Sequence, residues 1–272
     1  MKIFIRFKGS VDLGIINTDE WLQQDFHRPV KICEQHLRDS FDGDSPEKIY
    51  QYLVNFGMYK PNRRTLDSLK WMEKSGAWEG LAKVIDDYRK KWNGPDIPVY
   101  LFPMDPGGIF SNRGDRKSGV SFKDKIFLFI SPLDDDLELE ALFVHEYHHV
   151  CRMKKQKKKV DHYTLLDSMI LEGLAENAVL EMCGESYRAK WCTYYSSKDI
   201  SRIWEHHIKD NLDAHKNSRI HDEILFGYKN NPPLMGYAFG YELVERYKHK
   251  HQLTMKDSFS LPSETFVKEF SK

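Results

Sequence analysis

Several features that assign a protein to a specialised class are absent from this sequence of 272 residues. The four cysteines (Cys33, Cys151, Cys183 and Cys192) form no CxxC pair, so we expect reduced thiols, most of them buried, and no disulfide framework. No apolar run approaches the ~20 residues that a membrane span requires, so we expect no membrane partner. The formal net charge is +0, so no overall field favours binding to nucleic acid.

The first residues also lack the apolar core that follows the basic residues of a signal peptide. Together with reduced cysteines, this absence favours a cytoplasmic location. No internal repeat or low-complexity linker is present. Hydrophobic residues make up 40% of the chain and charged residues 30%, which is the composition of an ordinary globular protein that can bury a core.

The first third of the chain carries helix signals. The expected helices cover residues 18–37, 45–57, 66–74 and 78–92. Thr18 is expected to cap the first of them, and Pro29 to kink or break it. Ser45 is expected to cap the second, with a proline at its first helical position. We therefore predict an N-terminal helical region over residues 1–95.

The pattern changes after residue 95. Two short apolar runs rich in β-favouring residues, 97–102 and 126–130, predict strands joined by a Gly-rich loop. Further helices are expected at 137–153, 165–183, 199–212, 234–250 and 264–270. The predicted fold class is α+β, mostly helical, with a small β-sheet. Residues 96–272 form the second predicted domain, unless both regions pack as a single unit.

The strongest chemical signal is the segment His145-Glu146-Tyr147-His148-His149, an HExxH arrangement. On an α-helix, residues four apart lie on one face, so His145 and His149 can direct two imidazoles at one ion. Glu146 lies about 100° round the helix, close enough to reach a water at the metal without occupying the metal itself. His148 could instead pair with His145 at a spacing of three residues, but the position of Glu146 favours the HExxH pair.

The context of this helix supports a functional site. The residues on its opposite face are apolar: Leu139, Phe143, Tyr147 and Val150. The segment LFVHEYHHVC carries no formal charge except Glu146, whereas a solvated helix with incidental histidines would carry more charges. The pattern predicts a helix packed in a core with its histidine face on a cleft.

A catalytic zinc takes three protein ligands and leaves the fourth position to water. The best candidate for the third ligand is Glu172, in the segment LEGLAE on the next predicted helix. Glu176 is four residues further on and shares that helix face. Glutamates usually lie on helix surfaces, but these two interrupt an otherwise apolar stretch, which weakens the surface interpretation.

The segments HEYHHVCR and LEGLAE resemble those of gluzincin metallopeptidases, whose third zinc ligand is a glutamate on the following helix. More closely, the chain resembles the YjaZ family of bacterial proteins, which are predicted Zn-dependent proteases. The matching segments are TDEWL, RPVKICE, GVSFKDKIFLFISP, HEYHHVCR, LLDSMILEGLAE and GYAFGYELV, spread over nearly the whole chain.

This resemblance implies a zincin-like fold and one zinc ion per chain, bound by His145, His149 and Glu172. In thermolysin-like gluzincins a carboxylate four residues past the glutamate ligand orients the first histidine, a role that Glu176 could fill here. The thermolysin segment itself is not reproduced, because a glutamate stands here in place of its aspartate.

The chemistry expected of this site is hydrolysis, with zinc activating a water and Glu146 acting as general base. The developing oxyanion needs a further donor, which gluzincins take from a downstream tyrosine or histidine. Tyr237 is the first candidate, Tyr241 the second, and His221 or His215 the third. An aromatic helix face packed in the core is an equally good interpretation of Tyr237. The adjacent pair at positions 206 and 207 is interpreted as surface histidines.

The predicted function is therefore that of a zinc-dependent metallopeptidase acting on a peptide or protein substrate. One alternative is a zinc-containing binding or regulatory protein without turnover, and another is hydrolysis of a non-peptide amide. Glu146 favours catalysis, because a structural zinc site has no use for a carboxylate there and usually fills its fourth position with Cys or His. The sequence specifies neither the substrate, nor exo- or endopeptidase preference, nor oligomeric state.

Overall fold

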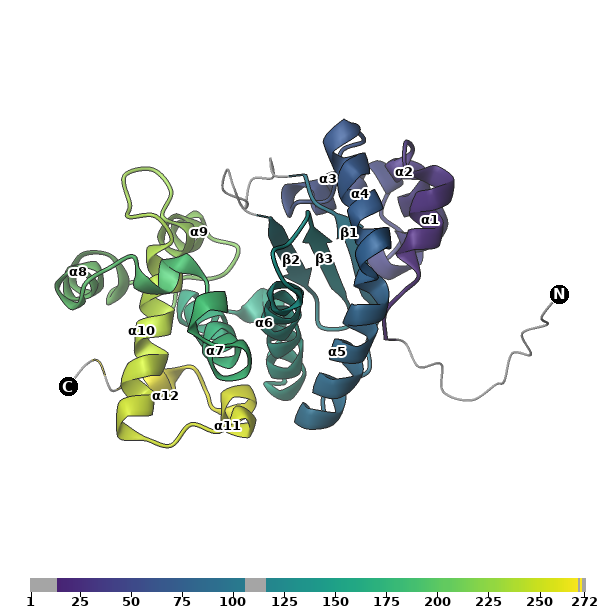
Figure 1. Cartoon of the computed structure of the whole chain (residues 1–272). Coiled ribbons are helices and arrows are strands. Elements are labelled where there is room, and N and C mark those ends of the chain that lie inside the picture. The colour runs from purple at the N-terminus through teal and green to yellow at the C-terminus, as the bar shows by residue number, and fades with distance from the viewer. Residues whose placement is uncertain (1–13, 106–115, 269, 271–272) are drawn as a thin grey trace. The chain divides into compact units, whose positions relative to one another are not determined.

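The computed structural model describes residues 14–105, 116–268 and 270 (Figure 1). The chain forms two compact units, one of residues 1–118 with 124–132, the other of residues 119–123 with 133–272. The N-terminal segment 1–13 and residues 106–115 of the predicted Gly-rich loop lie outside the described residues. The division into domains at residue 95 stays a prediction, because a compact unit is not a test of independent folding.

The first unit contains helices and a small sheet. Its elements are α1 (Thr18–Asp25), α2 (Pro29–Ile32), a π-helical turn (Cys33–Leu37), a 3₁₀ turn (Arg38–Phe41), α3 (Pro46–Asn55), α4 (Arg63–Ser75), α5 (Ala77–Trp92), β1 (Val99–Pro103) and β3 (Ile126–Ile130). β1 and β3 run parallel, with Val99 opposite Ile126. Every residue of both strands is buried, as expected of apolar runs covered on both faces. The α+β, mostly helical prediction is confirmed.

The third strand, β2 (Lys117–Ser121), was not predicted and lies where the sequence indicated only a loop. The strand order is β1-β3-β2. All five residues of β2 are half-buried, and its sequence KSGVS lacks the apolar alternation that identifies a strand.

The prediction that Thr18 caps the first helix is wrong. Thr18 is the first helical residue and is fully buried. Its hydroxyl donates to the carbonyl of Leu101 and accepts from the indole of Trp78 at 2.9 Å, so it links α1 to β1 and α5. Pro29 begins α2, which confirms the expected break. Ser45 caps α3 as predicted, its side chain accepting from the backbone N–H of Lys48.

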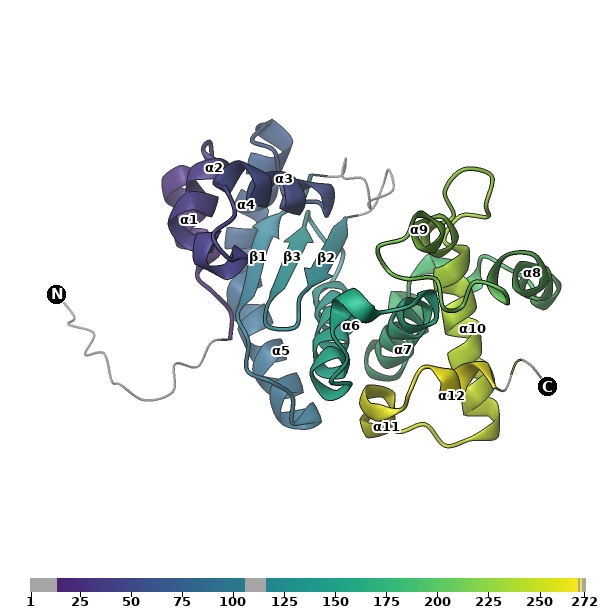
Figure 2. The ribbon, with the colours of Figure 1, turned by 180° about the vertical axis from the view of Figure 1, so that it is seen from behind.

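The second unit is helical apart from its share of β2. Its helices are α6 (Asp136–Lys155), α7 (Leu165–Cys183), α8 (Ser197–Ile203), α9 (Arg219–Phe226), α10 (Met235–Lys250), α11 (Met255–Ser260) and α12 (Glu264–Val267). Short 3₁₀ and π turns connect them at Val160–His162, Glu185–Tyr187, Lys190–Thr193 and Trp204–Ile208. α7 lies between α6 and α10, as Figures 1 and 2 both show. α9 and α11 were not predicted.

Caps at α6 and α7 explain why both begin where they do. The Asp135 carboxylate accepts from the backbone N–H of Glu138 at the start of α6. Thr164 and Asp167 form a reciprocal capping box at the start of α7.

The central position of α7 depends on a close approach to α10. A Cβ on Gly173 would lie 2.4 Å from the carbonyl oxygen of Gly240, and a Cβ on Gly240 would lie 2.0 Å from the carbonyl oxygen of Met169. Both contacts are with backbone atoms, which cannot move aside as a flexible side chain can. Glycine at both positions therefore lets the two backbones touch.

A buried polar network ties the far end of α6 to the C-terminal segment. The Arg152 guanidinium, 2% exposed, donates to the carbonyls of Ser258 and Leu261 at 2.6 and 3.0 Å. Ser263 accepts from the same guanidinium and donates to the Asp167 carboxylate of α7 at 2.8 Å. These bonds satisfy a charge that would be costly to bury without partners.

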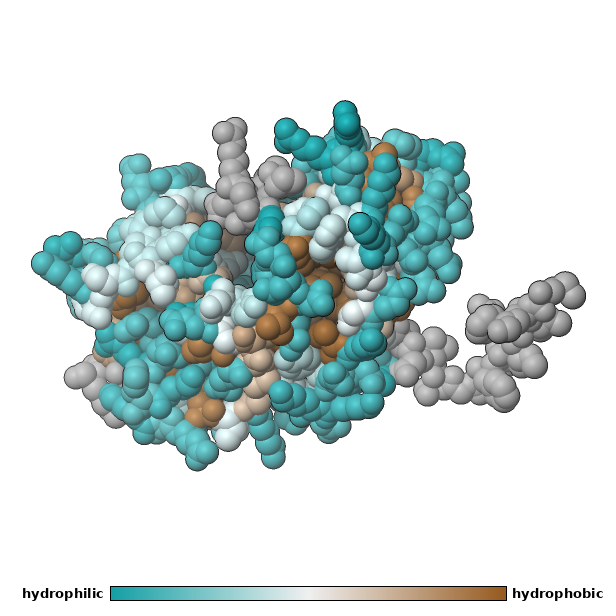
Figure 3. Space-filling view, in the orientation of Figure 1, coloured by the Kyte–Doolittle hydropathy of each residue, from teal (hydrophilic) through white to brown (hydrophobic). Residues whose placement is uncertain are grey.

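On the face that Figure 3 shows, most described residues are hydrophilic, and the apolar residues gather in a few areas. None of the helices in the described parts of the chain combines the length and the apolar character that crossing a bilayer requires.

The glycine contact between α7 and α10 predicts that alanine is more destabilising at position 240 than at a glycine with open space around it. We expect Gly240→Ala to lower the free energy of unfolding by about 2 kcal/mol or more, because overpacking against backbone forces the helices apart. Gly80→Ala is the control, because Gly80 lies within α5 and nothing stands within 4 Å of its added Cβ. This variant should be neutral or stabilised by up to about 1 kcal/mol. Urea denaturation measures both, and equal stabilities would contradict the packing argument.

Candidate metal centre

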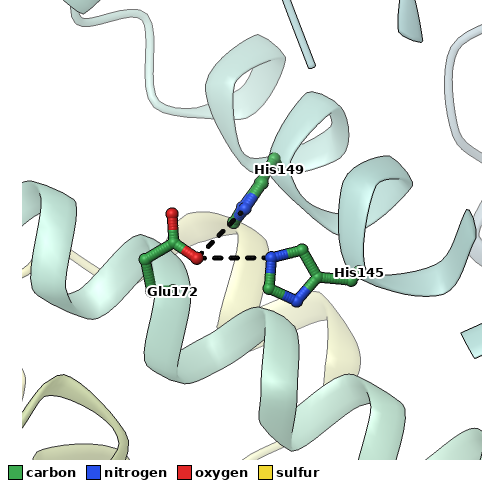
Figure 4. A group of neighbouring side chains, drawn as sticks. All are labelled: His145, His149 and Glu172. Atoms are coloured by element: carbon green, nitrogen blue, oxygen red, sulfur yellow. Dashed lines mark ion pairs between the residues drawn. The ribbon is translucent and has the colours of Figure 1, made fainter. Parts of the chain in front are cut away.

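Three side chains from α6 and α7 converge on one point (Figure 4). His145 and His149 project from α6, and Glu172 faces them from α7. The Glu172 Oε2 atom lies 3.3 Å from His145 Nε2 and 3.6 Å from His149 Nε2. The centroids of the two imidazole rings are 4.5 Å apart and the rings are nearly perpendicular, and both Nε2 atoms face the same carboxylate oxygen.

Helix geometry explains the histidine pair, and helix packing explains the glutamate. The four-residue spacing of His145 and His149 places both rings on one face of α6. The helix that carries Glu172 packs against α6, which brings the carboxylate to that face. This is the set of three residues that the sequence indicated.

Glu176 contacts the His145 ring on the side away from Glu172. Its Oε1 atom lies 2.7 Å from His145 Nδ1, on the opposite side of the ring from Glu172. Its other oxygen, Oε2, accepts from the backbone N–H of Ala189 at 2.6 Å, and the Cys192 thiol lies 3.9 Å from it. Nδ1 of His145 thus faces Glu176, and Nε2 faces Glu172.

The charged side chains of this cluster strongly shift one another's pKa values. Burial acts to lower the pKa of His145, but hydrogen bonds to Glu172 and Glu176 and the charges of both carboxylates raise it well above its ordinary value. Burial acts to raise the pKa of Glu172, but the His149 charge and the hydrogen bonds of both imidazoles hold it below its ordinary range. The cluster therefore favours a positive charge among its donors, and a bound cation would displace protons.

Glu146 lies beside the cluster on α6 and is 6% exposed. Its Oε2 atom accepts a hydrogen bond of 2.5 Å from the hydroxyl of Ser121, at the end of β2. Gly119 also contacts this side chain, because a Cβ there would lie 2.6 Å from Glu146 Oε1. Residues 119–123 belong to the same compact unit as α6, so these contacts lie within one unit.

Tyr237 on α10 is also at the cluster. Burial, the charges of Glu172 and Glu146 and a hydrogen bond with Glu172 raise the pKa of its phenol well above the ordinary value. The ring contacts Trp191 at 5.2 Å and Phe226 at 5.8 Å. The ring thus packs in an aromatic group, and its hydroxyl interacts with Glu172.

The other candidates for an oxyanion donor have different partners. Tyr241 is buried, and its hydroxyl accepts from Arg188 at 2.5 Å. His221 is 2% exposed and uses both ring nitrogens, bonding Ser168 through Nε2 at 2.9 Å and Asp222 through Nδ1 at 2.8 Å. His215 is exposed.

Three other histidines that the sequence raised are not members of the cluster. His148 is fully buried, and its Nε2 lies 3.0 Å from the Ser258 hydroxyl. His206 is exposed and His207 half-buried. The four cysteines are free thiols; Cys33 and Cys151 are buried, and the other two half-buried.

The sequence interpretation missed Ser121, Gly119 and the Ala189 amide. A backbone amide is present in every residue except proline, so the residue type at position 189 could not indicate this contact. Ser121 and Gly119 do lie in one of the segments that carry the family resemblance, GVSFKDKIFLFISP, but that segment was given no chemistry.

The three donors define a candidate metal centre of the HExxH type, in which two histidines from one helix meet a glutamate from the next. The family model "Predicted Zn-dependent protease (DUF2268)" matches residues 77–268, which include every residue of this centre. The chain belongs to this family of predicted zinc-dependent proteases.

Two relatives from Bacillus subtilis (strain 168) are similar to the chain. "Uncharacterized protein YjaZ" is 35% identical over 224 residues, which cover 80% of this chain and 84% of that protein. "Uncharacterized protein YjfC" is 24% identical over 188 residues, covering 65% of this chain and 62% of that protein. The resemblance to the YjaZ family drawn from the sequence is therefore confirmed. No solved structure matches the chain.

Proposed function

We propose that this protein is a zinc-dependent peptidase of the gluzincin type, with a zincin-like fold and one zinc ion per chain. The observation that carries the proposal is the convergence of His145 Nε2 and His149 Nε2 on a single oxygen of Glu172, at 3.3 and 3.6 Å. The family supports a proteolytic role and hence a peptide or protein substrate.

The donor set fits zinc. Two imidazoles and one carboxylate are borderline ligands that suit Zn²⁺. Tetrahedral coordination with bonds of about 2.0–2.1 Å separates neighbouring donors by roughly 3.3–3.4 Å. The separations between Glu172 and the two histidines are close to this value. We assign His145, His149 and Glu172 as the residues that would hold the ion.

The number of donors favours catalysis over a structural role. Structural zinc sites have four protein ligands, whereas catalytic sites have three and an open position. Within the described residues the cluster has three members, and no cysteine or further histidine belongs to it. A zinc-containing regulatory protein without turnover would also have no use for the buried carboxylate of Glu146 beside the cluster.

Zinc bound here would polarise the scissile carbonyl and lower the pKa of the attacking water toward neutrality. Glu146 accepts the proton of that water and then donates it to the leaving nitrogen. Glu176 keeps the Nδ1 proton on His145, so that Nε2 remains available to the metal. The Tyr237 hydroxyl, whose raised pKa keeps it protonated, donates to the oxyanion that develops on the substrate.

The role of Glu146 as general base can be tested by substitution. We expect Glu146→Gln to retain close to one zinc per chain, because the ligands are unchanged, and to lose at least ~10²-fold in peptidase activity. Elemental analysis measures the zinc, and cleavage of a proteome-derived peptide library with and without chelator measures the activity. If the variant keeps activity within a few-fold of wild type, the base lies elsewhere. If the wild type itself cleaves no peptide, non-peptide amides become the substrates to test.

The second prediction separates the two carboxylates of α7. Glu172→Ala removes a proposed ligand and should leave the protein largely zinc-free after mild dialysis. Glu176→Ala removes only an orienting hydrogen bond and should weaken zinc affinity by about 10–100-fold, with the site still filling at excess zinc. Competition with a chromogenic chelator compares the two variants side by side. The reverse order of affinities would exchange the two roles.

The third prediction concerns the oxyanion. We expect Tyr237→Phe to lower kcat by roughly 10²-fold, because the ring and its packing remain while one donor is lost. Arg188 occupies the Tyr241 hydroxyl, so Tyr241→Phe should change kcat by no more than a few-fold. Steady-state kinetics and thermal melting of both variants test this assignment, and an unchanged kcat for Tyr237→Phe would leave that residue with a packing role alone.

A further inference from the structure

We propose that Ser121 and Gly119, on strand β2, are positioning residues for the general base, holding the Glu146 carboxylate in its working orientation. This inference rests on the proposed function, because it assumes that Glu146 is the base. It adds a part of the machinery outside the HExxH helix and the glutamate helix, contributed by residues that the sequence placed in a loop.

The hydrogen bond from Ser121 is the first observation. Its hydroxyl donates to Glu146 Oε2 at 2.5 Å, at the short end of the range for a hydroxyl bonded to a carboxylate. In the described part of the chain, Ser121 is the residue that hydrogen-bonds this carboxylate. The bond occupies one carboxylate oxygen and leaves the other, Oε1, to accept a proton.

The close approach of Gly119 is the second observation. A Cβ on Gly119 would lie 2.6 Å from Glu146 Oε1, 2.7 Å from Cγ and 2.8 Å from Cδ. Residues two apart in a strand face the same side, so Gly119 and Ser121 present one continuous surface to the glutamate. Gly119 forms the wall of this surface and Ser121 supplies its hydrogen bond.

A physical reason exists for such a surface. A glutamate side chain has several rotatable bonds and loses substantial entropy when it is fixed in one rotamer. A base that accepts a proton from one site and delivers it to another must keep its geometry, since a displacement of about 1 Å can cost 10²-fold in rate. The ligands on α6 restrain the backbone of Glu146 but not its carboxylate, so that restraint must come from another element.

Substitutions of Ser121 and Gly119 should have different effects on kcat. Ser121→Ala removes the hydrogen bond and should lower kcat by about tenfold, with KM within about twofold of wild type. Ser121→Thr keeps a hydroxyl and should recover most of the lost kcat. In Gly119→Ala the added methyl displaces the Glu146 side chain, which is flexible enough to move, so kcat should fall by about 10–100-fold without loss of folding.

The control is Ser118→Ala, which makes the same chemical change on the same strand at a position that faces the opposite side. It should leave kcat unchanged within about twofold. Zinc affinity should stay within about threefold of wild type in all four variants, because none of them alters a proposed ligand. Ser121→Ala or Gly119→Ala proteins that lose zinc or melt well below wild type would show general disruption of the site and overturn a positioning role.

A readout independent of activity separates this inference from the proposed function. Crystal structures of the zinc-loaded wild type, Ser121→Ala and Gly119→Ala proteins should show the Glu146 carboxylate displaced or in several rotamers only in the variants. An unmoved, ordered carboxylate in both variants would overturn the inference even if the enzyme is a peptidase. If the wild type cleaves no peptide, the proposed function fails, and the crystal structures alone then decide whether β2 positions Glu146.

Discussion

The contact between the backbones of α7 and α10 is the constraint on which the site depends. Gly173 and Gly240 allow these helices to approach until their main-chain atoms touch. Gly173 follows Glu172 directly, so the same contact sets the depth at which the carboxylate emerges from α7. It also brings α10 and Tyr237 toward Glu172. A larger side chain at either glycine would separate the elements that carry the proposed oxyanion donor and the glutamate ligand.

The second organising feature is the presence of three glutamate carboxylates close together at the candidate metal centre, where they are largely shielded from water. Glu146 is 6% exposed and Glu176 is 4% exposed, and Glu172 lies 3.3 Å from His145 and 3.6 Å from His149. Burying carboxylates is costly unless each has a partner. Here each has a partner: Glu172 has the two imidazoles, Glu176 has the other side of His145 and a backbone amide, and Glu146 has Ser121. Such an arrangement suits a site that binds a cation and moves protons.

Helices and strands were predicted accurately where the local sequence carried strong signals, and were missed where it did not. α7 was predicted to the residue, because a residue that can cap a helix, Thr164, precedes a long apolar segment and Gly184 follows it. β3 was also predicted to the residue, since its five apolar residues are buried. β2 was missed because KSGVS has no apolar alternation, and α9 and α11 were missed because short helices derive their stability from packing. Thr18 was misassigned as a cap because its real partners are far away in sequence.

The sequence by itself determined the histidine pair and the neighbouring glutamate on one helix, because a spacing of four residues specifies a common helix face whatever surrounds the helix. It also indicated both glutamates of LEGLAE, since charges within an apolar stretch need a reason. Tertiary structure decided the rest. It brought Glu172 rather than Glu176 to the two Nε2 atoms and gave Tyr241 to Arg188. It also placed Ser121 against Glu146. These distances join residues from different elements, and only the packing of those elements sets them.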